Sequence, residues 1–215
     1  YAEVKDNNDP KGLGRIRVQF PWQKTTNQLS PWLRISTPYA GKGKGFHVVP
    51  EEGEEVLVGF ESGNAEKPFV LGAMFHGKGK SGLGGVGNFV KGFTTASGTK
   101  VEMNDEDSSV TISDPSGNTI TLNGDGTMTI SAPDKIEINS KEIIINGETK
   151  VEITSEEITA TGTNKVSINS DTLIEEVSGD KMSLGAENIE ANANLNMDLN
   201  GGAMTNIKGG TVNLN

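Results

Sequence analysis

The sequence predicts an all-β fold, in which a small five-stranded barrel precedes an intertwined, trimeric, triangular β-prism. Three observations lead to this prediction. All seven Phe, both Trp and both Tyr lie within residues 1–93. After that point, a triplet with one polar residue between two apolar residues recurs about every eight residues. The charge changes at the same place: residues 1–93 hold 12 Lys and Arg against 9 Asp and Glu, whereas residues 94–215 hold 7 Lys against 20 Asp and Glu.

Residues 1–76 are predicted to form the barrel domain, because short alternating segments are separated there by Gly and Pro. Ile16, Val18 and Phe20 share one face of the clearest segment. Five strands in about 75 residues, without helical periodicity, favour a closed or nearly closed barrel. Its core is expected to be rich in aromatic residues. The predicted strands are residues 15–20, 32–35, 45–49, 55–60 and 69–75.

Several motifs in this domain resemble one family, in order and with family-like spacing. They are Asp6-Asn7-Asn8-Asp9-Pro10, Leu13-Gly14-Arg15-Ile16-Arg17-Val18, Phe20-Pro21-Trp22, Ser30-Pro31-Trp32-Leu33-Arg34, Ala40-Gly41-Lys42-Gly43, Val49-Pro50-Glu51-Glu52-Gly53-Glu54-Glu55-Val56-Leu57-Val58 and Lys67-Pro68-Phe69-Val70-Leu71-Gly72. The stretch closely resembles the OB-fold domain of VgrG proteins, the valine-glycine repeat spikes of type VI secretion systems. It is also similar to the central spikes of contractile phage tails and related injection systems.

The resemblance implies a homotrimer whose OB domains ring the base of a β-helical needle. It also implies that a larger hub domain precedes this chain, which would explain the abrupt start at Tyr1, and that tail-tube and baseplate proteins lie on that side. The resemblance further implies that this chain is assembled in the bacterial cytoplasm and then expelled by the injection apparatus.

Residues 77–98 are predicted to be a glycine-rich connector that carries no cofactor. Gly82-Leu83-Gly84-Gly85-Val86-Gly87 matches a dinucleotide-binding string, but the residues after it have no helix signal to supply the phosphate-binding N-terminus. Gly79-Lys80-Ser81 lacks the first glycine of a P-loop. Asn123-Gly124-Asp125-Gly126 could be a calcium-binding turn, although a lone copy is more typical of a hairpin turn. Gly41-Lys42-Gly43-Lys44-Gly45 could bind nucleic acid or carbohydrate, but a solvated turn or a subunit contact is favoured.

The composition offers little for catalysis or for nucleic-acid binding. The chain has no cysteine, and its two histidines, His47 and His76, stand alone in the sequence. A structural role is favoured for both, and no catalytic, metal-binding or cofactor-binding residue is expected. The acidic second half is poorly suited to nucleic acid, because phosphate contacts need Lys and Arg. No apolar run approaches the roughly 18 residues of a membrane span.

Residues 99–215 are predicted to form the needle domain. Strict alternation indicates strands with one buried face, and a fixed period indicates stacked repeats. One such strand buries too little apolar area to offset its ordering entropy, so the strands must stack. A single chain could coil into a solenoid, or three chains could wind into a prism. The prism is favoured, because the inward side chains are small and uniform and the strand pattern runs to residue 215 with no predicted cap.

The predicted inward residues of the trimer are mostly aliphatic. They are Val101, Met103, Val110, Ile112, Ile120, Leu122, Met128, Ile130, Ile136, Ile138, Val151, Ile153, Val166 and Ile168. The register is least certain between residues 170 and 210, where Val177 and Leu195 interrupt the pattern. The strand ends at the C-terminus are expected to be a platform for a PAAR-type tip protein: Gly210, Thr211, Val212, Asn213, Leu214 and Asn215.

The leading hypothesis is therefore a non-enzymatic spike at the tip of a contractile injection apparatus. It would cross a target membrane mechanically and deliver effectors. The alternative is a monomeric β-solenoid that binds or cleaves carbohydrate and carries an OB-fold module. Phe93 is the last aromatic residue of the chain, which counts against this alternative, because sugars stack on aromatic side chains.

Overall fold

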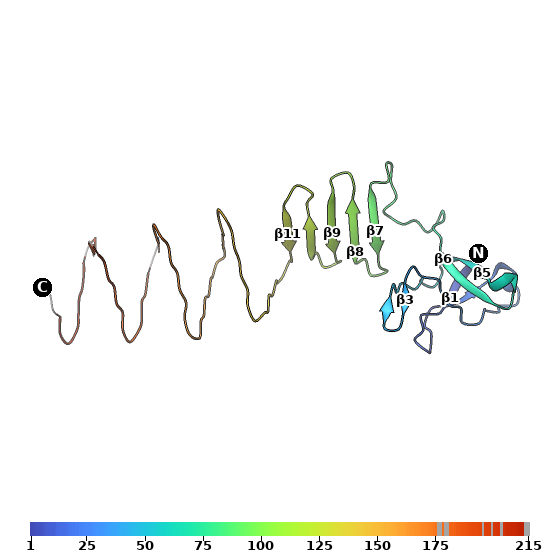
Figure 1. Cartoon of the computed structure of the whole chain (residues 1–215), viewed down its shortest axis with the longest axis horizontal. Helices are drawn as coiled ribbons and strands as arrows, with labels where there is room; N and C mark the ends of the chain where they lie inside the picture. Colours follow the sequence, from blue (N-terminus) through green and yellow to red (C-terminus); the bar gives the residue numbers. More distant parts are fainter. Residues whose placement is uncertain (176–177, 179–180, 195, 199, 203, 213–215) are drawn as a thin grey trace. The chain divides into compact units, whose positions relative to one another are not determined.

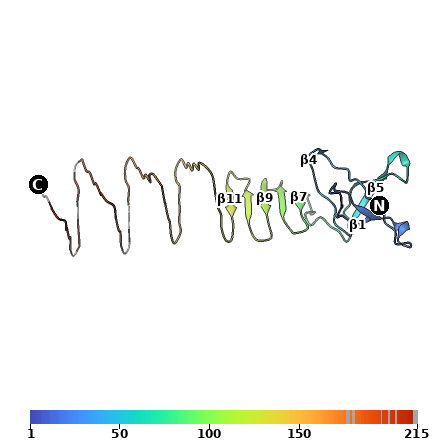
Figure 2. The ribbon, with the colours of Figure 1, turned by 90° about the horizontal axis from the view of Figure 1, so that it is seen from below.

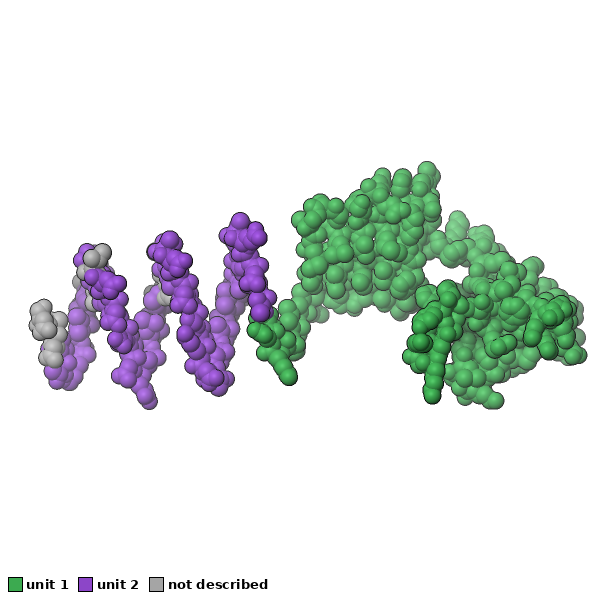
Figure 3. Space-filling model, viewed as in Figure 1, with its two compact units in different colours: residues 1–143 green, residues 144–215 purple. Residues whose placement is uncertain are grey.

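The computed structural model describes residues 1–175, 178, 181–194, 196–198, 200–202 and 204–212. The chain divides into two compact units, residues 1–143 and 144–215 (Figure 3). The regular secondary structure of the described residues is almost entirely β-strand, and it lies within residues 2–131. The strands are β1 (Ala2–Asp6), β2 (Arg17–Gln19), β3 (Ala40–Gly41), β4 (Lys44–Gly45), β5 (Glu55–Phe60), β6 (Pro68–Ala73), β7 (Val90–Thr94), β8 (Lys100–Asn104), β9 (Ser109–Ser113), β10 (Thr119–Leu122) and β11 (Met128–Ser131), with short 3-10 helices η1 (Pro21–Gln23) and η2 (Glu61–Gly63).

The first sheet closes into a five-membered ring. Its strands are hydrogen-bonded in the order β2-β1-β5-β6. Residues 33–35 join the two free edges, because Leu33 forms an antiparallel bridge to Ile16 and Ile35 a parallel bridge to Val70. The Val70 amide donates to the Arg34 carbonyl at 2.9 Å, which continues this contact. The predicted barrel is therefore confirmed, and its closure is that of an OB fold.

Two strand predictions for this barrel are wrong. The strand β1 was missed, although Ala2 and Val4 alternate there with polar residues and are fully buried. The expected barrel strand at residues 45–49 is absent, because Gly45 pairs with Ala40 in the short β3–β4 hairpin instead. A side chain at position 45 would lie 2.8 Å from the Tyr39 carbonyl oxygen, so glycine permits this tight pairing.

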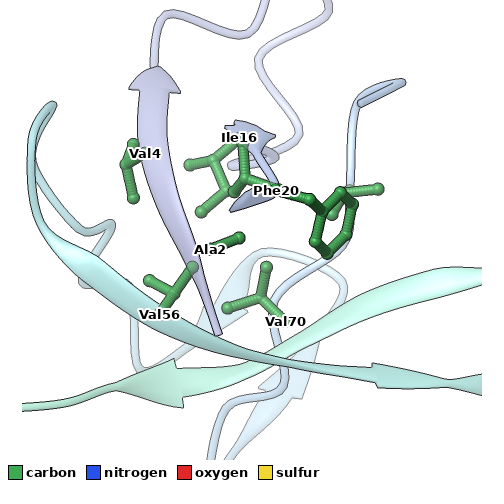
Figure 4. Packing of buried hydrophobic residues seen from close by; sticks show 8 residues of the cluster. Ala2, Val4, Ile16, Phe20, Val56 and Val70 are labelled. Carbon is green, nitrogen blue, oxygen red and sulfur yellow. The ribbon is translucent and has the colours of Figure 1, made fainter. Parts of the chain in front are cut away.

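The barrel core is aliphatic, which corrects the expectation of an aromatic core. Phe20 is the only aromatic residue in the buried cluster, and Trp22 is 65% exposed. The narrow interior of a five-stranded barrel suits branched aliphatic side chains, which leaves most of the larger rings on the outside. Figure 4 shows the labelled side chains converging from different strands. The buried apolar residues are Ala2, Val4, Ile16, Val18, Phe20, Leu33, Val56 and Val70.

A carboxylate fixes the loop that leads into β2. The Asp9 side chain is only 3% exposed and pairs with the Arg15 guanidinium through contacts of 2.7 and 2.8 Å. It also accepts hydrogen bonds from the backbone amides of Lys11 and Leu13, both at 3.0 Å. These hydrogen bonds hold the pKa of Asp9 far below its ordinary value, and the one from the Arg15 side chain has the largest effect.

The second sheet is an antiparallel meander in the order β11-β10-β9-β8-β7 (Figure 1). The four triplets that begin at Val101, Val110, Ile120 and Met128 lie in β8 to β11, so these strands are confirmed. The sheet starts earlier than predicted. Strand β7 lies inside the expected connector at residues 77–98 and pairs with β8 over its full length.

Aspartate side chains hold the turns of this meander. Asp107, Asp114 and Asp125 each accept a hydrogen bond from the backbone amide two residues later, at 2.9–3.0 Å. Side-chain hydrogen bonds, from Ser109, Asn118 and Thr127 respectively, are the largest cause that lowers the pKa of each of these carboxyls. The run from Asn123 to Gly126 connects β10 to β11, which confirms its interpretation as a hairpin turn.

The described residues between 132 and 215 form no strand within a single chain. Over the described residues of the second unit, the trace runs back and forth in successive crossings (Figures 1 and 2). The described side chains of this unit are exposed, and Ile144, Ile153 and Ile168 are each 69–70% exposed. The later triplets therefore have no pairing partner within the described part of their own chain.

We expect Asp9→Asn to lower the melting temperature of the barrel at pH 7 by several degrees. Both Trp residues lie in this domain, so Trp fluorescence reports its unfolding. Because folding depresses the pKa of Asp9, the stabilisation is complete above a pH of about 4, where Asp ionises in unfolded chains, and is lost as the pH falls towards the folded-state value. The difference in melting temperature between the unaltered protein and the Asp9→Asn variant should therefore become smaller in acid. Glu66→Gln, at an exposed carboxylate, is the control, and an equal loss there would contradict this role.

We also expect Gly124→Ala to loosen β10 and β11 more than Gly126→Ala does. Both glycines have left-handed φ angles, 79° and 89°, so each substitution costs about 1–2 kcal/mol of backbone strain. Only at Gly124 would the new carbon also collide with a backbone oxygen, that of Asp107, at 2.0 Å. Hydrogen exchange of residues 119–131 measures the difference. Equal exchange in the two variants would show that the turn does not pack against the Asp107 carbonyl.

Candidate functional site

The candidate site is an apolar face on the β7–β11 sheet. Strand register aligns its side chains in two rows that run across the strands. In the first row, Val101 lies opposite Ile112, and Ile112 lies opposite Ile120; in the second, Val110 lies opposite Met103 and Leu122. We define the apolar face as Phe93, Val101, Ile112, Ile120 and Ile130 in the first row, and Met103, Val110, Leu122 and Met128 in the second.

The opposite face of the same sheet is polar. Glu102 lies opposite Thr111, which lies opposite Thr121, and Thr121 lies opposite Thr129. The hydroxyl oxygens of Thr111 and Thr121 are 3.5 Å apart. Because successive side chains of a strand point to opposite faces, the apolar–polar–apolar triplet produces this separation directly. Threonine suits such a solvated sheet surface.

The described residues of the chain do not cover the apolar face. Its residues other than Val101 and Val110 are 43–60% exposed, and the two valines are half-buried. Complete burial of a Val, Leu, Ile, Phe or Met side chain is worth about 1.5–3 kcal/mol relative to exposure. A contiguous apolar surface of this kind marks an interaction site on a soluble protein. The arrangement therefore supplies binding energy rather than chemistry.

The structure brings together only some of the predicted trimer-core residues. The first eight, from Val101 to Ile130, lie on the apolar face. The other six are 54–70% exposed and belong to no strand of the single chain: Ile136, Ile138, Val151, Ile153, Val166 and Ile168. Of the predicted tip platform, Gly210, Thr211 and Val212 are exposed, whereas Asn213, Leu214 and Asn215 lie outside the described residues, as do Val177 and Leu195.

The sequence prediction missed Phe93, which extends the first row by pairing with Val101. The sequence does contain a signal for the strand that carries Phe93. Gly98 has a φ of 92° and ends a turn in which the Thr95 hydroxyl accepts the Thr99 amide at 3.2 Å. A glycine turn directly before the first triplet predicts a preceding strand. The lack of a fitting apolar triplet in residues 90–94 concealed this strand.

Other candidate chemistry finds little support in the part of the chain that the structure describes. No group of three or more His, Asp or Glu side chains in it could hold a metal ion. Strand β7, rather than a helix, follows the glycine string at residues 82–87. His76 is exposed, and its Nδ1 accepts the Lys78 amide at 3.3 Å in a tight turn. No described helix is long and apolar enough to span a membrane.

Comparison with known proteins concerns the barrel. Residues 1–75 match the type VI secretion system/phage-baseplate injector OB domain. The chain is 42% identical over 66 residues to the type VI secretion system spike protein VgrG4b of Pseudomonas aeruginosa, and 38% identical over 66 residues to the actin cross-linking toxin VgrG1 of Vibrio cholerae. It is 33% identical over 67 residues to the spike protein VgrG3 of Vibrio cholerae.

These matches cover 29–30% of this chain and only 6–8% of the relatives, so the chain spans a small part of the length of the proteins that it matches. The ring closure of the barrel and these identities agree on the nature of the N-terminal domain. Residues 1–75 are an OB domain similar to those of type VI secretion and phage-baseplate injectors, and the resemblance of this chain to VgrG spike proteins is confirmed over that domain.

Proposed function

We propose that this chain is the needle-bearing part of a structural, non-enzymatic spike at the tip of a contractile injection apparatus. The apolar face carries this proposal, because the sheet that bears it follows an injector OB domain in the same chain and leaves the face uncovered. In such a protein, further copies of the chain or other subunits must cover the apolar face before the second half is stably folded. The similarity of the OB domain to type VI secretion spike proteins supports the same function.

Three identical chains are the assembly that we favour. A threefold arrangement closes on itself and directs each copy of the apolar face towards a common axis, which avoids open-ended polymerisation. The described triplets after residue 131 could then pair between chains, since they find no strand partner within one chain. Intersubunit pairing would satisfy their backbone amides and carbonyls, which a lone extended chain leaves to water.

The needle would act mechanically. Continuous pairing between chains would make it stiff and narrow, and contraction of the apparatus would drive it through a target membrane. The net charge of −13 on residues 94–215, from 7 Lys against 20 Asp and Glu, would keep its β-surface soluble and discourage edge-to-edge pairing.

The remaining parts of the proposal concern partners and location. A hub domain with tail-tube and baseplate proteins would lie on the N-terminal side, and a PAAR-type protein would cap residues 210–215. The spike would be assembled in the bacterial cytoplasm and expelled with any effector cargo. Two of the relatives are named as spike proteins of type VI secretion systems, which supports this location.

The substitution Ile112→Asp tests the apolar face. Ile112 occupies the middle strand β9, and a trimer would bring three carboxylates into an apolar interior, where ionised groups are strongly disfavoured. We expect this variant to lose the trimer in sedimentation velocity. Thr111→Asp is the matched control, because it adds the same charge to the opposite face of the same strand and should leave the trimer intact. Equal effects of the two substitutions would contradict the assignment of the buried face.

The later repeats need a separate test. We expect Ile153→Asp to weaken the trimer, since Ile153 is predicted to face the axis, and to increase cleavage of residues 144–215 by a nonspecific protease. Thr154→Asp adds the charge at the neighbouring position, which is predicted to face outwards, and should behave like the unaltered protein. If the Ile153→Asp protein stays trimeric and protease-resistant, the inward register of this segment is wrong.

A further inference from the structure

A groove in the OB domain is not used by the proposed needle function. It has a volume of about 660 Å³ and lies between the loop of residues 12–14 and the β3–β4 hairpin. Arg34, Lys44 and His47 contribute basic groups to its lining, while Tyr39 and Phe46 contribute aromatic ones. The lining contains no carboxylate. We call this feature the cationic groove.

The hairpin beside the groove is weakly supported by its own chain. Its ladder pairs only Ala40 with Gly45 and Gly41 with Lys44. At its base, the Phe46 amide donates to the Tyr39 carbonyl and the Thr37 hydroxyl donates to the Phe46 carbonyl, both at 2.8 Å. The side chains of Tyr39 and Phe46 remain 55% and 56% exposed. A two-stranded hairpin is at best marginally stable by itself in water. The hairpin therefore stands to gain from a partner that covers its aromatic side chains.

The groove also keeps unneutralised charge. The Lys44 ammonium lies 5.8 Å from the centre of the Tyr39 ring, which is a cation–π contact. Among the described residues, no salt bridge involves Arg34 or Lys44 of the groove lining. An occupant that carries carboxylates would complement these groups.

A surface of opposite charge begins two residues after Val49, the last residue of the groove lining. The loop before β5 carries Glu51, Glu52 and Glu54, which are all exposed. Glu51 accepts a hydrogen bond from the Asn7 amide group at 3.1 Å, and Glu54 accepts one from the Glu51 backbone amide at 3.0 Å. Within the described part of the chain none of these carboxylates has a cationic partner. We call residues 51–54 the acidic loop.

We propose that the cationic groove of one OB domain receives the acidic loop of a second copy of this chain. This proposal rests on the trimer of the proposed function and names the contact between neighbouring OB domains. In a ring, each subunit presents one surface to the neighbour ahead and a different surface to the neighbour behind. Two complementary surfaces on one domain, neither neutralised within its own chain, are what such head-to-tail contacts require.

The absence of cysteine from the sequence permits a direct cross-linking test. A Lys44→Cys chain with one affinity tag is co-expressed with a Glu52→Cys chain with another tag. The purified trimer is treated with a short bis-maleimide, and two-chain products that carry both tags are measured on a denaturing gel. The matched control replaces Glu52→Cys by Glu66→Cys. Glu66 is also an exposed glutamate, but it follows the opposite end of the six-residue strand β5, roughly 20 Å along.

We expect several-fold more dual-tag product with Glu52→Cys than with Glu66→Cys, and little product from either single-cysteine chain alone. A trimer that gives no dual-tag product, or equal amounts with both partners, would overturn the contact between groove and loop while leaving the trimer in place. A monomeric mass for the purified protein would overturn the trimer itself, and with it this contact. The two failures are therefore distinguishable.

Discussion

The apolar face of the β7–β11 sheet is the constraint on which the rest of the molecule depends. Two rows of apolar side chains, with Phe93 at one end, lie on one side of a five-stranded meander, and no described part of the chain covers them. Aspartate and glycine turns hold the strands in the register that creates these rows. Burial of such a surface is the main favourable term in folding and association, so we expect this half of the protein to gain stability when the face is covered on assembly.

The OB domain differs from the β7–β11 sheet, because its apolar core is complete within one chain. Residues 33–35 close the ring between β2 and β6, and aliphatic side chains fill the interior. Most aromatic rings remain outside. Phe20 links the barrel core to these outer rings. It is buried in the core, and its ring stacks on that of the exposed Trp22 with ring centres 4.5 Å apart. The domain can thus fold independently and still present aromatic and charged surfaces to neighbours. That combination suits a collar at the base of a larger assembly.

Much of this arrangement could be predicted from local sequence patterns. Alternation identified the strands at Val101, Val110, Ile120 and Met128, because a period of two residues fixes which side chains share a face. The inward face at Ile16 and Val18 followed for the same reason. The wrong predictions concern residues whose strand pairing or burial depends on tertiary contacts. Gly45 appeared to begin a barrel strand, yet it pairs within a hairpin; the rings of Trp22 and Phe46 appeared to belong in a core, yet the narrow barrel leaves them outside. The described triplets after residue 131 form no strand within the chain, and under the proposed assembly their pairing depends on other chains, which no pattern within one chain can specify.

We propose that two further copies of the chain complete its second half. Multi-angle light scattering of the purified 215-residue protein tests this claim most directly, because mass is measured without reference to shape. The account predicts a single species of three times the 22.7 kDa chain mass, which persists on dilution and in mild detergent. A well-folded species of one chain mass would contradict it, since the apolar face would then be stable without a partner.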